Sequence, residues 1–349
     1  MQTRICRLHG QNDIRIETQP VAVPAAGEVL VAIGAGGICG SDLHYYQDGG
    51  FGPIRVKEPI ILGHEASGTV IEIGEGVTNV AVGDRIAINP SRPCNDCAYC
   101  REGLFQHCLD MRFNGSALRF PHEQGLFRDL IVVEAGQCLP VSAEVSFAEA
   151  ACAEPLAVCL HARRRAGDLC SKRVLVTGAG PIGVLCAALA AEAGAAEVVV
   201  TDLQDVPLQA ASAMGATRVI NVGRDGAEME AYAADKGHFD VAFECSAAAP
   251  AIRSAITTLR PQGLLIQVGV SGDVPVPLNM LVGKEITFRG THRFHEEFAE
   301  AVAMISSRGI DLTPMISQSY PMEEARAAFD VAGDRSRSVK VHLTFAADT

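Results

Sequence analysis

Four cysteines lie close together in one turn-rich stretch of the sequence. They are Cys94, Cys97, Cys100 and Cys108, separated by two, two and seven residues. Four thiolates on a short loop match the ligand set of a closed tetrahedral zinc site, which leaves no position open for a substrate. The spacing therefore predicts a structural zinc loop over residues 94–108, in which metal binding stabilises the fold. A redox switch or an iron–sulfur cluster uses the same kind of ligand and stays an alternative.

Other residues able to bind a metal are far apart in the sequence. Cys39 stands alone, His64 and Glu65 are adjacent, and Glu154 precedes a proline. These side chains can share one catalytic zinc only if the fold brings them together. A lone cysteine is more often a core residue, so the residues by themselves leave both interpretations open.

A glycine pattern points to a dinucleotide. Gly178, Gly180 and Gly183 form G-x-G-x-x-G directly after the apolar run 174–177, and Asp202 follows nineteen residues after Gly183. Such glycines allow a tight turn and a close approach of the backbone to a pyrophosphate at a helix N-terminus. Asp202 would bind the ribose hydroxyls, which favours NAD over NADP. A glycine-rich turn without a ligand is the alternative.

The surrounding patterns predict two domains in an α/β protein. Short β-branched runs separated by Gly and Pro reach from residue 4 to about 145 and indicate a barrel-like β domain. After residue 155, strands and helices alternate, which is typical of a doubly wound parallel sheet. The uncharged run 174–191 contains several Gly and a Pro, and we interpret it as a strand, turn and helix rather than a membrane span.

Composition excludes some classes of function. The chain has 349 residues, with 29 Lys and Arg against 41 Asp and Glu, for a formal net charge of −12. This disfavours a nucleic-acid partner. The first ten residues lack the apolar stretch of a secretory signal, so we expect a cytoplasmic protein without a membrane partner. Apart from Cys39 and the loop, we expect the cysteines to be small buried hydrophobes.

The segment from Gly63 to Val77, with the cysteine loop and glycine pattern after it, resembles the zinc-dependent medium-chain alcohol and polyol dehydrogenases. The resemblance spans essentially the whole chain. It implies a GroES-like β-barrel catalytic domain over residues 1–150, a Rossmann domain binding NAD over 151–289, and a segment 290–349 that returns to the catalytic domain. It also implies a homo-tetramer, or a dimer, paired through an edge strand near residues 283–289.

The same resemblance implies roles for individual residues. Cys39 and His64 would bind a catalytic zinc with Glu65 or Glu154, so that the chain holds two zinc ions. The cation would lower the pKa of the substrate hydroxyl, and Ser41 and His44 would relay its proton. A helix-capping Ser41 and a surface His44 are the alternative. The residues expected to contact NAD are Gly178, Gly180, Pro181, Ile182, Gly183, Asp202, Val268, Gly269, Val270 and Arg293.

Segments outside the general motifs resemble the bacterial L-idonate 5-dehydrogenases, among them 36–47, 87–94, 110–117 and 283–294. The implied reaction is oxidation of L-idonate at C5 to 5-keto-D-gluconate, or its reverse. Oxidation of sorbitol, xylitol or a related polyol is the alternative, and a metal-binding structural protein or a zinc-ribbon module is a rival from another class. The resemblance places Tyr45, Glu154 and Arg293 near the substrate, and Phe294 where sorbitol dehydrogenases carry Tyr. A sugar acid needs a cation for its carboxylate, for which the candidates are Arg293, Arg112 and Arg119.

Overall fold

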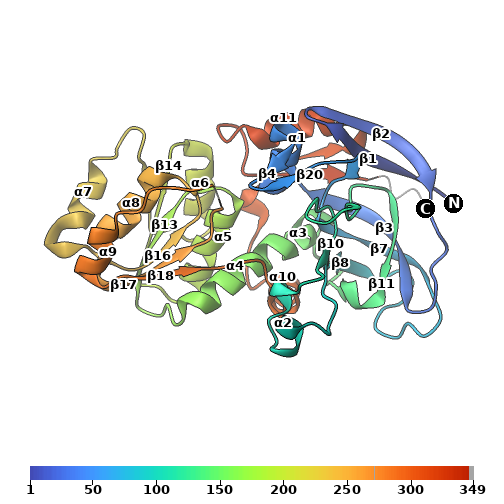
Figure 1. Ribbon diagram of the computed structural model, residues 1–349, viewed down its shortest axis with the longest axis horizontal. Coiled ribbons are helices and arrows are strands. Elements are labelled where there is room, and N and C mark those ends of the chain that lie inside the picture. The colour runs from blue at the N-terminus through green and yellow to red at the C-terminus, as the bar shows by residue number, and fades with distance from the viewer. Residues whose placement is uncertain (271, 346–349) are drawn as a thin grey trace.

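The chain forms two lobes joined by packed helices (Figure 1). The computed structural model describes residues 1–270 and 272–345. The last four residues of the predicted returning segment, 346–349, lie outside the described part. None of the helices in the described part is long and apolar enough to cross a membrane, and the uncharged run 174–191 is divided between a strand and a helix.

The first lobe is built from β-sheets. Its elements are β1 (Gln2–Gly10), β2 (Asp13–Pro20), β3 (Glu28–Gly37), α1 (Gly40–Asp48), β4 (Gly50–Phe51), β5 (Ile54–Arg55), β6 (Ile60–Ile61), β7 (Glu65–Ile73), β8 (Arg85–Ile88), β9 (Ser91–Arg92), α2 (Ala98–Arg101), β10 (Arg112–Phe113), β11 (Leu130–Glu134), β12 (Cys138–Pro140) and α3 (Phe147–Ala151). The central sheet has the order β12-β8-β7-β3-β20-β19, in which β19 (Ile316–Pro321) and β20 (Lys340–Thr344) come from the end of the chain, and β11 also pairs with β3. β3 buries eight of its ten residues because partners cover both of its faces.

The second lobe is a parallel sheet with helices on its faces. Its elements are α4 (Ala153–Ala166), β13 (Arg173–Thr177), α5 (Pro181–Glu192), β14 (Glu197–Asp202), α6 (Asp205–Ala213), β15 (Arg218–Asn221), α7 (Glu228–Ala233), β16 (Phe239–Glu244), α8 (Ala249–Thr258), β17 (Leu259–Gln267), α9 (Leu278–Lys284) and β18 (Thr287–Gly290). The strand order within the described residues is β15-β14-β13-β16-β17-β18, and all neighbours are parallel. This is the doubly wound order of dinucleotide-binding folds, so the predicted α/β class is confirmed.

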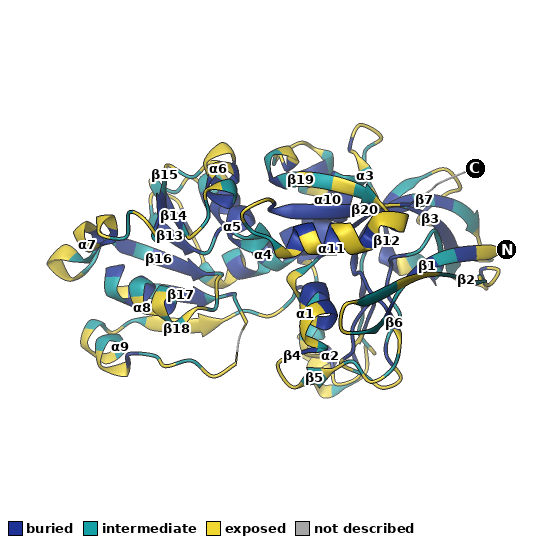
Figure 2. Ribbon diagram, turned by 90° about the horizontal axis from the view of Figure 1, so that it is seen from above, coloured by how far each residue is buried: buried dark blue, intermediate teal, exposed yellow. Residues whose placement is uncertain are grey.

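The end of the chain returns to the first lobe. After α10 (Glu297–Ser306) come β19 (Ile316–Pro321), α11 (Ala325–Gly333) and β20 (Lys340–Thr344). β20 pairs antiparallel with β3 and parallel with β19, so the last described strand completes the central sheet. Figure 2 shows α4, α5 and α10 where the lobes meet, and most residues of α4 and α5 and half of those of α10 are buried there. These helices pack against one another and hold the lobes together.

The outer edge of the parallel sheet is open to solvent. All four residues of β18 are exposed, and β18 ends the sheet among the described strands. An unpaired strand edge is a template for pairing with another chain. Self-association through this edge stays a prediction, which sedimentation of the full chain can test.

Candidate active site and metal centres

The four loop cysteines converge. Their Sγ atoms all lie within 4.8 Å of one another, and Cys97 Sγ lies 3.5 Å from Cys100 Sγ. Tetrahedral zinc with bonds of about 2.3 Å places its sulfur ligands about 3.8 Å apart. Backbone N–H groups support the thiolates: Cys94 donates to Cys108 Sγ at 3.1 Å, and Leu109 donates to Cys97 Sγ at 3.5 Å. The Leu109 N–H also helps to lower the pKa of Cys97 to about 6, so this donor set fits a zinc ion.

A second metal-competent group lies between the lobes. The ligand atoms of Cys39, His64 and Glu65 lie within 4.8 Å of one another. Cys39 is the N-cap of α1, and His64 and Glu65 stand at the start of β7. Glu65 fits only because its neighbour on β3 is a glycine: a Cβ on Gly37 would lie 2.1 Å from Glu65 Oε2. One thiolate, one imidazole and one carboxylate with space beside them form the donor set of a catalytic zinc.

A buried aspartate holds the backbone around this group. The Asp42 carboxylate accepts hydrogen bonds from the Cys39 N–H at 3.1 Å and from the Gly63 N–H at 3.2 Å. It also lies 3.7 Å from His64 Nδ1. Because Asp42 reaches both peptide segments, it fixes the position of Cys39 relative to His64.

The two candidate carboxylates differ in their surroundings. Glu65 pairs with Lys340 of β20, whose Nζ lies 2.8 Å from Oε1 and 2.7 Å from Oε2, and both side chains are 1% exposed. Glu154 stands at the start of α4 and lines the same cleft, but it is not part of the group of three ligand atoms. Burial raises the pKa of Glu154 to about 7. Sequence analysis did not find Lys340, because no local pattern marks it.

The glycine pattern has the geometry of a phosphate-binding turn. Gly178 has φ of +85°, and a Cβ on Gly183 would lie 1.8 Å from the Gly178 carbonyl oxygen. Gly180 is the N-cap of α5, and Pro181 is the first residue of that helix. Asp202 closes the turn from β14, because its carboxylate accepts a hydrogen bond from the Ala179 N–H at 2.7 Å. Only glycine fits at positions 178 and 183, and the helix N-terminus faces the cleft.

An arginine absent from the predicted site completes this turn. Arg335 lies in the loop between α11 and β20 and lines the cleft. A Cβ on Gly180 would lie 3.2 Å from Arg335 Nη1, so the guanidinium group lies against the glycine turn. No ion pair joins Arg335 to a carboxylate among residues 1–270 and 272–345. The sequence offers no signal for it beyond a basic residue in a polar loop.

One cleft of about 400 Å³ gathers most of the predicted residues. Gly178, Asp202 and the four loop cysteines do not line it. Arg293 does, and its guanidinium carbon lies 4.2 Å from the centre of the Phe113 ring. The predicted residues that line the cleft are Cys39, Ser41, His44, Tyr45, His64, Glu65, Glu154, Gly180, Pro181, Ile182, Gly183, Val268, Gly269, Val270 and Arg293.

Three considered residues lie elsewhere. Arg112 pairs with Glu123 at 2.9 Å and Arg119 pairs with Asp110, and both arginines line a separate cavity. Phe294 is 1% exposed and stacks on Phe298 in the core. The structure therefore leaves Arg293 as the cleft arginine of the three candidates. Arg112 faces the separate cavity while its strand neighbour Phe113 lines the cleft.

The proposed relay residues lie on α1 at the mouth of the cleft. Cys39, not Ser41, is the N-cap, so the alternative of a helix-capping Ser41 is wrong. The His44 side chain is 47% exposed and its Nδ1 lies 2.9 Å from Asp48 Oδ2. His44 is thus both a cleft residue and a solvent-facing one.

Two family models match the chain. The alcohol dehydrogenase GroES-like domain matches residues 25–143, and the zinc-binding dehydrogenase model matches residues 181–307. The chain belongs to the zinc-binding alcohol dehydrogenase family. The predicted GroES-like and Rossmann folds of this dehydrogenase are confirmed by these matches, as is its assignment as a zinc-dependent oxidoreductase.

The relatives with similar sequences include dehydrogenases of sugar acids and polyols. It is 40% identical over 346 residues to the L-idonate 5-dehydrogenase (NAD(P)(+)) of Escherichia coli (strain K12), with 99% of each chain covered. The crystal structure of that enzyme matches with a TM-score of 0.94. The sorbitol dehydrogenase of Gallus gallus is 36% identical, with 96% of this chain and 94% of the relative covered. A zinc-binding dehydrogenase from Sinorhizobium meliloti bound to NADP is 27% identical, covers 99% of both chains and has a TM-score of 0.88.

We predict that the loop cysteines hold one of two zinc ions per chain. Cys97→Ser should reduce the zinc content, measured by mass spectrometry of metal-replete protein, from two ions to one, because a tetrahedral site loses a ligand. Cys170→Ser is the matched control, since Cys170 lies outside both metal groups. The prediction that this cysteine is a small buried hydrophobe is wrong, because Cys170 is exposed. A Cys97→Ser protein that kept two zinc ions would contradict the assignment.

Proposed function

We propose that this dehydrogenase oxidises L-idonate at C5 to 5-keto-D-gluconate with transfer of a hydride to NAD, and catalyses the reverse reaction. The observation that carries the proposal is an unpaired cation in the cleft. Arg293 lines the cleft with the metal-competent group and the glycine turn, and no carboxylate of the described residues forms an ion pair with it. The 40% identical relative supports the same substrate class.

Arg293 is suited to bind the carboxylate of a sugar acid. Its side chain is buried enough that burial lowers its pKa, and it stacks on Phe113 rather than on an acidic group. A planar guanidinium group binds a carboxylate through two parallel hydrogen bonds. The charge of Glu154 acts on this cation without forming an ion pair with it. A substrate carboxylate would supply a direct partner, which favours an aldonate over sorbitol or xylitol.

The remaining cleft residues have separate roles in the proposed reaction. Zinc at Cys39, His64 and a carboxylate would lower the pKa of the substrate hydroxyl. Tyr45 is buried and its Oη accepts a hydrogen bond from the Ala117 N–H at 3.3 Å, which orients its ring beside the substrate space. Ser41 lies one turn of α1 before His44, so we propose that a proton leaves through Ser41 to the exposed His44.

We expect a preference for L-idonate over sorbitol and xylitol when NADH formation is followed with zinc-replete protein. Arg293→Gln should raise KM for L-idonate about 10- to 100-fold, because a charged hydrogen-bond pair is lost, and should leave KM for sorbitol nearly unchanged. A higher rate with sorbitol or xylitol would move the function to polyol oxidation. An equal rise in KM for both substrates would assign Arg293 to the fold or the cofactor instead.

We propose Glu65 as the third zinc ligand and Glu154 as a residue that acts beside the metal. Glu65→Gln should then lose the catalytic zinc, while Glu154→Gln should keep both zinc ions and lose turnover. Because Glu65→Gln also leaves Lys340 buried without an anion, the double variant Glu65→Gln, Lys340→Met separates ligand loss from misfolding. Unchanged zinc and turnover in both single variants would refute a role for either carboxylate.

We propose NAD as the preferred cofactor, with Arg335 on its pyrophosphate. Asp202 supports NAD, since a carboxylate at the end of β14 repels a 2′-phosphate. Arg335 and the N-terminus of α5 present positive charge to the same space beside Gly180. An anionic pyrophosphate between them would neutralise both.

Arg335→Ala should weaken binding of NADH and of ADP-ribose about ten-fold or more, measured by calorimetry. Adenosine has no pyrophosphate, so its affinity should not change. Arg253→Ala serves as the matched control, because Arg253 is an exposed arginine of α8 away from the cleft. An equal loss for adenosine would place the effect on the fold rather than on the pyrophosphate.

A further inference from the structure

A second cavity lies in the first lobe, apart from the catalytic cleft. It has a volume of about 500 Å³ and is bounded by β1, β2, the β9–β10 hairpin and the segment that leads into β11. It shares none of its lining residues with the catalytic cleft. Its lining includes four arginines, Arg92, Arg112, Arg119 and Arg128, with Glu123 as the acidic residue among them.

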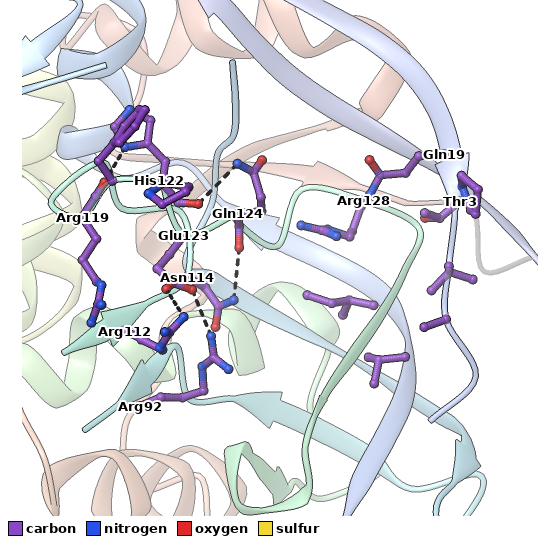
Figure 3. Close-up of a pocket in the computed structure, with 17 residues that line it drawn as sticks. Thr3, Gln19, Arg92, Arg112, Asn114, Arg119, His122, Glu123, Gln124 and Arg128 are labelled. Carbon is purple, nitrogen blue, oxygen red and sulfur yellow. Dashed lines mark hydrogen bonds and ion pairs between the residues drawn. The ribbon is translucent and has the colours of Figure 1, made fainter. Parts of the chain in front are cut away.

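The carboxylates around the cavity neutralise only part of this charge. Arg92 and Arg112 share Glu123, at 3.0 Å and 2.9 Å to its two oxygens. Arg92 also lies 3.4 Å from Glu134, and Arg119 pairs with Asp110 at the rim. Figure 3 shows Arg92 and Arg112 converging on Glu123, while the Arg128 guanidinium points away from Thr3 and Gln19 toward Gln124. The cavity is therefore a locally basic site in a protein with a net charge of −12.

Arg128 is the cation left without an anion. Its Nε donates to the Gly125 carbonyl oxygen at 2.9 Å, and no carboxylate within the described ranges forms an ion pair with it. This single hydrogen bond fixes the plane of the guanidinium group and leaves the Nη donors directed at the cavity. Burial and the charge of Arg7 lower the pKa of Arg128 to about 10, which still leaves it protonated at neutral pH.

A neutral donor and an apolar wall complete the cavity. Gln19 accepts a hydrogen bond from Arg7 Nη2 through Oε1 at 2.8 Å, so its amide nitrogen is free to donate. Val21, Ile131 and Val132 line the side near the central sheet. A phosphate group accepts hydrogen bonds from several directions at once, and a guanidinium group can bind it through two parallel N–H···O bonds.

We infer that this cavity is a phosphate-binding site of the first lobe, separate from the catalytic cleft, with Arg128 as its principal ligand and Arg112 as a neighbouring donor. The phosphate group is either inorganic phosphate or the head of a small phosphate ester, for which the volume leaves room. Holding the Arg128 guanidinium group out of water near the charge of Arg7 is unfavourable without an anion, and a bound phosphate would offset that cost.

The test is a calorimetric titration of the full-length, zinc-loaded chain with inorganic phosphate. The protein is first saturated with NADH, so that phosphate cannot enter the cofactor site. We expect one phosphate per chain in the wild type, and at least about ten-fold weaker binding in Arg128→Gln, since charged hydrogen bonds are lost. Arg128→Lys keeps the charge without the planar fork and should fall between the two.

Arg253→Gln is the matched control, because it removes one positive charge from the exposed face of α8 in the other lobe. It should bind phosphate like the wild type. Turnover and the thermal transition of Arg128→Gln should also stay near wild type, which separates loss of the ligand from loss of the fold. A hexose phosphate that binds more tightly than phosphate identifies an ester as the natural ligand, and equal affinity identifies phosphate itself.

Three results would overturn the inference. The first is absence of phosphate binding to the wild type at millimolar concentration, and the second is equal binding to Arg128→Gln. The third result concerns self-association. If the wild type binds no phosphate and Arg128→Gln changes the sedimentation mass, acidic residues of a second copy of this chain fill the cavity instead.

Discussion

The buried ion pair between Glu65 and Lys340 ties the metal group to the end of the chain. The two residues are 275 positions apart in sequence, and both side chains are 1% exposed. Burying two charges is costly unless their geometry is good and their remaining donors are satisfied, and removing one partner leaves the other uncompensated. Lys340 meets this condition by also donating to the Ile38 carbonyl oxygen, next to Cys39. The carboxylate is thus held beside Cys39 and His64 only when β20 has joined β3.

The same returning segment also contributes a residue to the part of the cleft that contains the glycine turn. Arg335 and Lys340 lie five residues apart, one against the glycine turn and the other against Glu65. β20 belongs to the sheet of the first lobe, whereas Gly180 belongs to the second. A change in the conformation of the loop between α11 and β20 would therefore alter contacts at both the metal group and the dinucleotide turn. This arrangement couples assembly of the active site to completion of the fold.

Charge is distributed unevenly over this acidic protein. Among the described residues, no carboxylate forms an ion pair with Arg293 or Arg335 in the catalytic cleft, or with Arg128 in the separate cavity. Surface arginines elsewhere mostly face a carboxylate, as Arg163 faces Glu192 at 2.7 Å. A partly buried cation without an anion is unfavourable in isolation, and these three half-buried arginines are the positions at which we propose that anions bind.

Local patterns in the sequence determined the parts of the site that are built from neighbouring residues. The spacing of Cys94 to Cys108 and the glycines from Gly178 to Gly183 specify short loops whose geometry depends on few long-range contacts. The alternation of strands and helices likewise specified the parallel sheet, because the spacing of apolar residues along each element reflects which of its faces is buried. The tertiary structure alone decided that Lys340 and Arg335 reach the cleft and that Arg112 and Arg119 do not. The reason is physical: an isolated charged residue on a loop carries no local signal, and its partner is set by which strands pair across hundreds of residues.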